Sequence, residues 1–203
     1  MIEVKVRKQL GEFLLSAELE DRGFICLAGK NGSGKTSLLR AIAGLLKVDD
    51  GYVRIDGFDV TRLPIDKRGV VMVTPNSYLP HLDVDAHITW GAKLKGMRPD
   101  DERVSKIKDR LGIDYGGSVR RLSVGMRVRV TLATAFMASP RVILVDEAFS
   151  NLHEKQSLLS SFRKLVGDEG MDLIFSTPDE ADGRLADCLY VIGNGKTTRQ
   201  QIA

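Results

Sequence analysis

Hydrophobic and polar residues alternate in two stretches near the start of the chain. Residues 2–6 and 13–19 place every second side chain on an apolar face, which predicts two half-buried strands with a hairpin-like turn at Gly11. Short apolar runs predict more strands, at 23–28, 52–57 (strand and turn), 69–73, 141–145, 171–175 and 188–192. The run at 69–73 is typical of a strand covered on both faces.

The middle of the chain has a helical pattern instead. Asp83 is placed to cap a helix over 84–94, Pro99 to open a second helix, and Ser123 to begin a third. The strand pattern then returns, with one more helix predicted over 154–166. A sheet interrupted by a helical insert explains this order better than two successive domains do.

We therefore expect an α/β fold with a parallel-rich sheet. It should be a single domain over 1–203, whose core comprises 1–73 and 138–203 and carries an antiparallel β subdomain at its N-terminus. An inserted α-helical subdomain should span about 74–137.

Composition narrows the class of protein only a little. The 203 residues are 43% hydrophobic and 28% charged, which is ordinary for a globular protein with one sizeable core. A net charge of +3 gives no reason to expect nucleic acid as a partner. No apolar run approaches the length of a membrane span, so we expect any membrane association to go through another protein. Cys26 and Cys188 are expected to be reduced core residues.

The strongest chemical signal is a glycine-rich segment after the strand at 23–28. Residues 29–36 match G-x-x-x-x-G-K-[ST] at every fixed position, and an apolar helical pattern follows them. In this strand–loop–helix setting, backbone N–H groups and the helix dipole can cradle phosphate. We expect the eight residues of this motif, and Ser37 after it, to bind ATP: Gly29, Lys30, Asn31, Gly32, Ser33, Gly34, Lys35, Thr36 and Ser37. Lys35 would bridge the β- and γ-phosphates, and the Thr36 hydroxyl would hold Mg²⁺.

A second signal lies at the end of the apolar run at 141–145. Asp146 follows this run directly, which is where such folds hold Mg²⁺ opposite the phosphate loop. The adjacent Glu147 is the candidate catalytic residue, placed to polarise the attacking water. Two solvated acids after a strand are the alternative interpretation.

Upstream of that strand, residues 122–133 carry a third motif. They resemble the signature L-S-G-G-Q-x-x-R-V-x-[LI]-A of ATP-binding cassette (ABC) proteins, and the order of phosphate loop, signature and carboxylate strand is also theirs. Residues 148–153 and the tail at 184–196 look like the corresponding parts of that family. Residues 57–68 are similar to a passage common in importers of oxyanions and polyamines, and residues 3–13 look most like molybdate/tungstate-type importers.

The resemblance implies a homodimer that encloses two ATP molecules. Ser123 and Gly125 of one subunit would close over the γ-phosphate held by the other subunit. Ser123 would also cap the helix that runs to Met137, although a capping serine on an ordinary helix is the alternative. The family stacks the adenine base on an aromatic residue ahead of the phosphate loop. Phe13 is the candidate here, with Leu10 as the competing register and packing of Phe13 into the core as the other interpretation.

Several switch positions depart from the family pattern. Thr74 stands where a glutamine is usual, and Thr177 takes the place of the family's histidine in an ungapped alignment, although a short deletion leaves that register open. Val124 and Met126 replace a signature glycine and glutamine. His153 replaces the aspartate of an inter-subunit loop. The groups expected to bind ATP and Mg²⁺ are thus intact, whereas groups that orient water are weakened.

The resemblance implies the ATP-binding subunit of a transporter, most of all an importer of an oxyanion or other small solute. It would lie in the cytoplasm on the inner face of the membrane, held by transmembrane permease subunits and served indirectly by a solute-binding protein. Hydrolysis is expected to be slow or dependent on partners. Two alternatives stay open: an ATP-gated dimerising subunit with little hydrolysis of its own, and a soluble ABC ATPase that does not transport.

Overall fold

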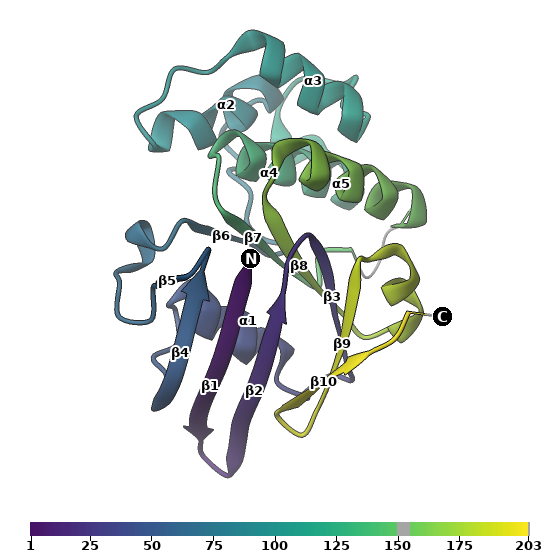
Figure 1. The fold of residues 1–203 in the computed structure, drawn as a ribbon. Coiled ribbons are helices and arrows are strands. Elements are labelled where there is room, and N and C mark those ends of the chain that lie inside the picture. Colours follow the sequence, from purple (N-terminus) through teal and green to yellow (C-terminus); the bar gives the residue numbers. More distant parts are fainter. Residues whose placement is uncertain (150–154, 203) are drawn as a thin grey trace.

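The computed structural model describes residues 1–149 and 155–202, and its strands form two sheets (Figure 1). The smaller sheet has the strand order β2-β1-β4-β5 and the larger has the order β10-β9-β3-β8-β7-β6. The strands of the smaller sheet are β1 (Ile2–Leu10), β2 (Phe13–Asp21), β4 (Asp50–Ile55) and β5 (Phe58–Asp59). Those of the larger sheet are β3 (Phe24–Ala28), β6 (Val70–Val73), β7 (Val142–Asp146), β8 (Asp172–Thr177), β9 (Cys188–Gly193) and β10 (Lys196–Gln200).

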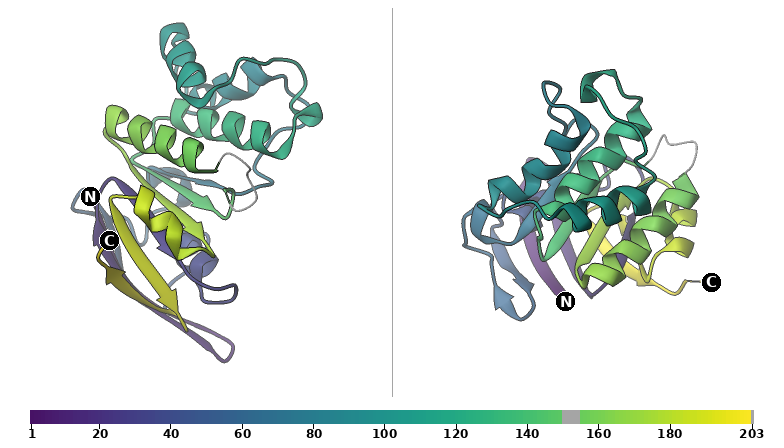
Figure 2. Two further views of the ribbon diagram at one scale, coloured as in Figure 1. Left: turned by 90° about the vertical axis from the view of Figure 1, so that its right-hand side faces the viewer. Right: turned by 90° about the horizontal axis from the view of Figure 1, so that it is seen from above.

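The helices lie in two places relative to these sheets. Helix α1 lies by the smaller sheet, and the other helices gather on the opposite side of the larger sheet (Figures 1 and 2). The α-helices are α1 (Lys35–Ala43), α2 (Val84–Leu94), α3 (Asp101–Leu111), α4 (Val124–Met137) and α5 (Lys155–Glu169). The described residues also form the short 3₁₀ turns η1 (Ile65–Lys67), η2 (Val119–Arg121) and η3 (Glu180–Leu185).

The smaller sheet confirms the expected antiparallel element at the N-terminus. Strands β1 and β2 pair from Ile2 with Asp21 to Leu10 with Phe13, and the hairpin turns at Gly11, whose φ of 60° suits glycine. On the other edge of β1, β4 pairs antiparallel with it. The alternating side chains of β1 and β2 bury one face of this sheet, as their spacing predicts.

The larger sheet is parallel except at one edge. Strands β6, β7, β8, β3 and β9 run parallel, and β10 pairs antiparallel with β9. The parallel-rich α/β fold is therefore confirmed. Strand β6 is an edge strand and three of its four residues are half-buried, yet both of its faces are covered, as the run at 69–73 predicts. Its apolar run reflects packing by α1 on one face and α4 on the other, beside an open edge.

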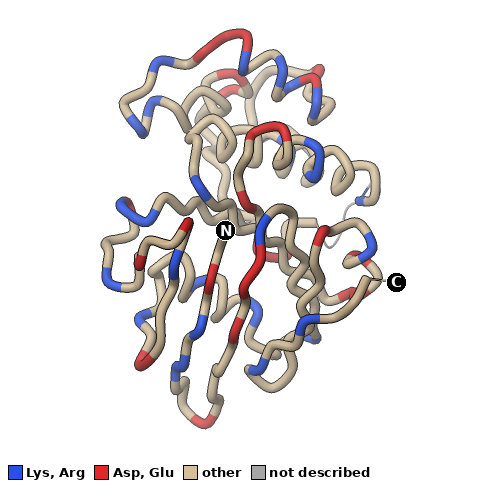
Figure 3. Tube along the Cα trace, viewed as in Figure 1, with Lys and Arg blue, Asp and Glu red and all other residues tan. Residues whose placement is uncertain are grey.

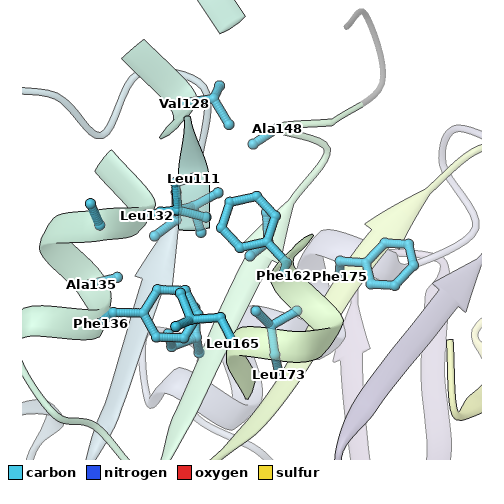
Figure 4. Packing of buried hydrophobic residues seen from close by; sticks show 14 of the residues in the cluster. Leu111, Val128, Leu132, Ala135, Phe136, Ala148, Phe162, Leu165, Leu173 and Phe175 are labelled. Carbon is cyan, nitrogen blue, oxygen red and sulfur yellow. The ribbon is translucent and has the colours of Figure 1, made fainter. Parts of the chain in front are cut away.

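Two hydrophobic clusters cover the two faces of the larger sheet. Strand β3 shows how they are divided: Phe24 and Cys26 belong to the cluster under the helices, while Ile25 and Leu27 belong to the cluster around α1. In the first cluster, the rings of Phe136 and Phe162 from α4 and α5 pack over the sheet (Figure 4). Because both faces are covered, the central strands are apolar throughout, and this produces the continuous runs in the sequence.

Helix caps explain where the inserted helices begin. The side chains of Asp83 and Ser123 accept N–H groups from the first turns of α2 and α4, which confirms both predicted caps. The expectation that Pro99 opens α3 was wrong. Asp100 caps that helix by accepting the Glu102 N–H at 3.0 Å, and the helix begins one residue later.

Charged residues of both signs are distributed over the fold, whereas both cysteines lie inside it. Positive and negative residues are interspersed along the chain (Figure 3). Cys26 and Cys188 are buried and not joined to each other, and burial raises the pKa of the Cys26 thiol well above its usual range. Within residues 1–149 and 155–202, no helix has the length and apolar character needed to cross a membrane.

Close packing of α2 against α4 gives a stability prediction. A Cβ built on Gly91 of α2 would lie 2.0 Å from the Thr134 carbonyl oxygen of α4, whereas one built on Gly167 of α5 meets nothing within 4 Å. We expect Gly91→Ala to destabilise the protein by about 1–3 kcal/mol through overpacking. The matched substitution Gly167→Ala should instead stabilise it by up to about 1 kcal/mol through helix propensity. Urea unfolding without nucleotide measures both, and equal effects would contradict this helix contact.

Candidate functional site

The phosphate loop joins the carboxyl end of β3 to the first turn of α1. Gly32 and Gly34 have φ values of 78° and 110°, in the left-handed region that favours glycine, and Gly34 is the residue before the helix. At the other end, a Cβ on Gly29 would lie 2.4 Å from the Ile192 carbonyl oxygen of β9. Glycine is therefore required here both for backbone conformation and for close contact with the neighbouring strand.

Lys35 is a buried cation at the centre of this loop. Its side chain is 3% exposed, and its Nζ donates to the carbonyl oxygens of Gly29 and Lys30 at 2.7 and 3.1 Å. The same Nζ lies 3.1 Å from Oε1 of Glu147, which follows β7. The ammonium group is thus held by acceptors from both halves of the site, as a buried charge requires.

Thr36 and Asp146 meet from opposite sides of the site. The Thr36 Oγ1 donates to Asp146 Oδ1 at 3.2 Å, although 110 residues separate them in sequence. Ser176 of β8 pairs with Asp146 in register and its hydroxyl donates to Asp146 Oδ1 at 2.8 Å. The parallel strands β3, β8 and β7 end at the same edge, so their carboxyl ends bring these groups together.

Ser176 was not found from the sequence. Its hydroxyl is fully buried and also accepts the N–H of Glu147 at 3.0 Å, so that it supports both acidic residues. Glu147 itself has a φ of 53°, which is uncommon for a residue with a side chain and costs about 1–3 kcal/mol. A polar residue at the buried end of an apolar strand is the only signal that could have drawn attention to Ser176.

A cavity of about 320 Å³ lies over the phosphate loop. Its lining combines loop residues with Phe13 and Glu147: Phe13, Asn31, Gly32, Gly34, Lys35, Thr36, Ser37 and Glu147. Phe13 is half-buried against the core around α1, and it also reaches Gly34, so both interpretations of this ring describe part of its surroundings. The hydroxyl of Ser33 is buried without a hydrogen-bond partner among the described residues, which leaves a polar group in the loop for a ligand to satisfy.

The oxygen atoms at this edge suit a hard cation. Thr36 Oγ1 and Asp146 Oδ1 are hydroxyl and carboxylate donors of the kind that Mg²⁺ binds, alongside water and phosphate oxygens. The residues present therefore fit magnesium at Thr36 and Asp146, next to a loop whose amides and Lys35 fit phosphate.

The two switch positions lie beside this edge but are occupied by internal contacts. Thr74 follows β6, and both its N–H and its hydroxyl lie 2.9 Å from the Ser77 hydroxyl. Thr177 ends β8 and is buried, with its hydroxyl bonded to Asp182. It is the backbone carbonyl of Thr177 that meets the phosphate loop, by accepting the Gly29 N–H at 3.1 Å.

The signature residues form the first turn of α4. The Ser123 hydroxyl accepts the Met126 N–H at 3.2 Å, Gly125 is half-buried, and Val124 is 51% exposed. Ser123 and Gly125 do not line the cavity over the phosphate loop of their own chain. The expectations for residues 150–153, including His153, lie outside the described residues.

A larger cleft lies at the other end of the sheet. Its volume is about 1340 Å³, and its lining includes Gly23, Arg141 and Asp172, which stand at the amino ends of β3, β7 and β8. Ligand sites of open parallel sheets lie at the carboxyl ends of the strands. The smaller cavity over the phosphate loop, with its cation, hydroxyls and carboxylates, is therefore the candidate site.

Known proteins are similar to this chain in both sequence and fold. The family model "ABC transporter" matches residues 14–150. A molybdate/tungstate import ATP-binding protein of Archaeoglobus fulgidus is 36% identical, over 96% of this chain and 84% of its own length. A sulfate/thiosulfate import ATP-binding protein of Synechocystis is 35% identical, over 94% of this chain and 57% of its own length.

Solved structures agree in fold. A dimeric ATP-binding cassette in a post-hydrolysis state, bound to ADP and Pi, matches with a TM-score of 0.83 and 22% identity, over 100% of this chain and 99% of that one. CbiO1 of Clostridium perfringens, part of an ABC transporter complex, matches with a TM-score of 0.80 and 21% identity, over 97% of this chain and 86% of that one. Together with the family model and the relatives, the fold leads to one conclusion: this chain belongs to the ABC transporter family.

Proposed function

We propose that this chain is the ATP-binding subunit of an import-type ABC transporter and that it hydrolyses ATP at the phosphate-loop site. The observation that carries the proposal is the meeting of Thr36 with Asp146, and of Lys35 with Glu147, at the carboxyl edge of the larger sheet. These contacts join a phosphate cradle to a pair of acids. The relatives named as import ATP-binding proteins support the same function.

The residues would divide the chemistry as follows. The amides of the loop and Lys35 would hold the β- and γ-phosphates, and Thr36 and Asp146 would hold Mg²⁺, which supplies charge neutralisation at the phosphate oxygens when bound. Once phosphate draws Lys35 away, the carboxylate of Glu147 would be free to accept a proton from water. The ring of Phe13 would lie against the adenine base.

Partners complete this function. We propose that two copies of the chain close over ATP, with Ser123 and Gly125 of each copy facing the phosphates held by the other. Residues 74–137 would act as a helical subdomain that carries this signature. Transmembrane permease subunits would hold the dimer on the cytoplasmic face of the membrane. An oxyanion is the proposed cargo, because two relatives are named for import of molybdate/tungstate and of sulfate/thiosulfate.

Removing the buried cation tests the phosphate site. We expect Lys35→Ala to weaken ATP binding about 10- to 100-fold, because a charge-assisted hydrogen bond is worth about 1.5–3 kcal/mol. Lys47→Ala, which removes an exposed lysine just beyond the other end of α1, should leave the affinity unchanged. Titration with a fluorescent ATP analogue measures both, with circular dichroism to verify that each variant is folded. Equal affinity in the two variants would refute the assignment.

Hydrolysis separates the transporter motor from a subunit that only binds ATP. We expect Glu147→Gln to bind ATP as the unmodified chain does and to hydrolyse it at least about 10²-fold more slowly in a single turnover. Glu180→Gln removes an exposed carboxylate and should change neither quantity. The isolated chain should itself turn over slowly, since one missing preorganised donor costs about 10²–10³ in rate. Rapid steady-state hydrolysis without partners would contradict that part.

A further inference from the structure

Helix α2 carries a histidine that is buried and bonded on both ring nitrogens. His87 is 2% exposed, and its Nε2 lies 3.0 Å from the backbone nitrogen of Leu79. Its Nδ1 lies 2.7 Å from the hydroxyl oxygen of Thr134 on α4. Because a backbone N–H can only donate, Nε2 must be the acceptor, and the proton of the neutral ring is on Nδ1.

The Thr134 hydroxyl can accept that proton because its own hydrogen has other partners. The hydroxyl can donate its hydrogen to the carbonyl oxygen of Val130 or to that of His87, each of which lies 2.9 Å away. One turn further along α2, Gly91 brings the two helices so close that a Cβ would touch the Thr134 carbonyl. The ring of His87 is therefore held rigidly on α4, and Leu79 is held on the ring.

Leu79 belongs to a loop that begins at the candidate site. This loop, residues 74–82, leaves β6 at Thr74, and β6 pairs with β7 so that Val73 lies opposite Val145, the residue before Asp146. A second contact joins the same loop to α4, since the guanidinium carbon of Arg127 lies 4.6 Å from the ring centre of Tyr78. Loop 74–82 is thus attached to α4 at two residues. Tyr78 contacts Arg127 of α4 directly, and Leu79 is linked to Thr134 of α4 through His87.

We propose that His87 is a positioning residue for ATP turnover, which holds loop 74–82 on α4 so that the two move together. This inference rests on the proposed function. There, loop 74–82 lies beside the ATP bound by its own chain, and α4 carries the signature that faces the ATP bound by the other copy. His87 does not touch the nucleotide site. It acts through the Leu79 N–H on one side and Thr134 on the other, and its loss would leave that N–H without its acceptor.

The neutral ring makes the attachment dependent on pH. Burial lowers the pKa of His87, and the charge of His81 on the same loop lowers it further, whereas the α4 groups that contact the ring or its backbone, Thr134 and Val130, are uncharged. If the loop detached and exposed the ring to water, the pKa of His87 would rise toward its ordinary value of about 6.5. The attachment is therefore at full strength above pH 6.5 and weakens as the pH falls below that value.

Two substitutions separate positioning from mere stability. His87→Gln retains an acceptor near the place of Nε2 but cannot titrate, whereas His87→Leu removes the acceptor. At pH 7.5 we expect amide exchange within 76–82 to rise about 10-fold or more in the leucine variant, with kcat reduced and ATP affinity within about twofold. The glutamine variant should recover most of the protection and of kcat. His81→Asn, which removes an exposed histidine of the same loop, is the matched control and should keep the protection.

Acidification supplies the second readout. Between pH 7.5 and 5.5, corrected for intrinsic exchange, the unmodified chain should lose protection in 76–82, and His87→Gln should not. Unchanged protection in His87→Leu would overturn the proposal, as would a rise of exchange spread evenly over α2, α4 and the loop. If every variant fails to bind ATP, the proposed function fails, yet the exchange data still decide whether His87 holds the loop.

Discussion

The parallel pairing of β3, β8 and β7 decides where the chemistry of this chain is placed. Strands that run parallel end at one edge, so the loop after β3 and the acids after β7 become neighbours. Asp146 reaches Thr36 at 3.2 Å across 110 residues, and Ser176 between them ties Asp146 to the backbone of Glu147. If β7 ran antiparallel to β3, the acids after β7 would lie at the opposite edge of the sheet from the loop after β3.

Electrostatics then completes the site around one buried cation. Lys35 is almost inaccessible to water and is satisfied by two loop carbonyls and by Glu147. The protein's own acceptors thus stand where phosphate oxygens would compete for the ammonium group. A cation held in this way is preorganised for an anion, because the cost of removing it from water is met during folding rather than on binding.

Much of this arrangement could be predicted from the sequence. The phosphate loop, the buried strands and the caps at Asp83 and Ser123 are local features, and each has a direct signature in residue type and spacing. The position of β6 at the sheet edge and the start of α3 depend on neighbouring residues instead. The apolar run of β6 is compatible with an edge strand as well as with a central one, and Asp100 rather than Pro99 caps α3 because its side chain reaches the Glu102 N–H.

Other features have no local signature at all. The role of Ser176 follows from its register opposite Asp146, and that of Thr177 is altered by its bond to Asp182. The two nitrogens of His87 acquire partners only when loop 74–82 and α4 come together. Such contacts require the tertiary structure, because each joins elements that are separate in the chain.

The most direct test of the account is the dependence of ATP affinity on magnesium. Equilibrium titration with and without Mg²⁺ should show tighter ATP binding in its presence, because the phosphate cradle and Asp146 would hold one metal–nucleotide complex. Asp146→Asn should bind ATP with an affinity that magnesium no longer improves. If magnesium has no effect on the unmodified chain, or improves binding equally in Asp146→Asn, the loop and the strand end do not form a single site.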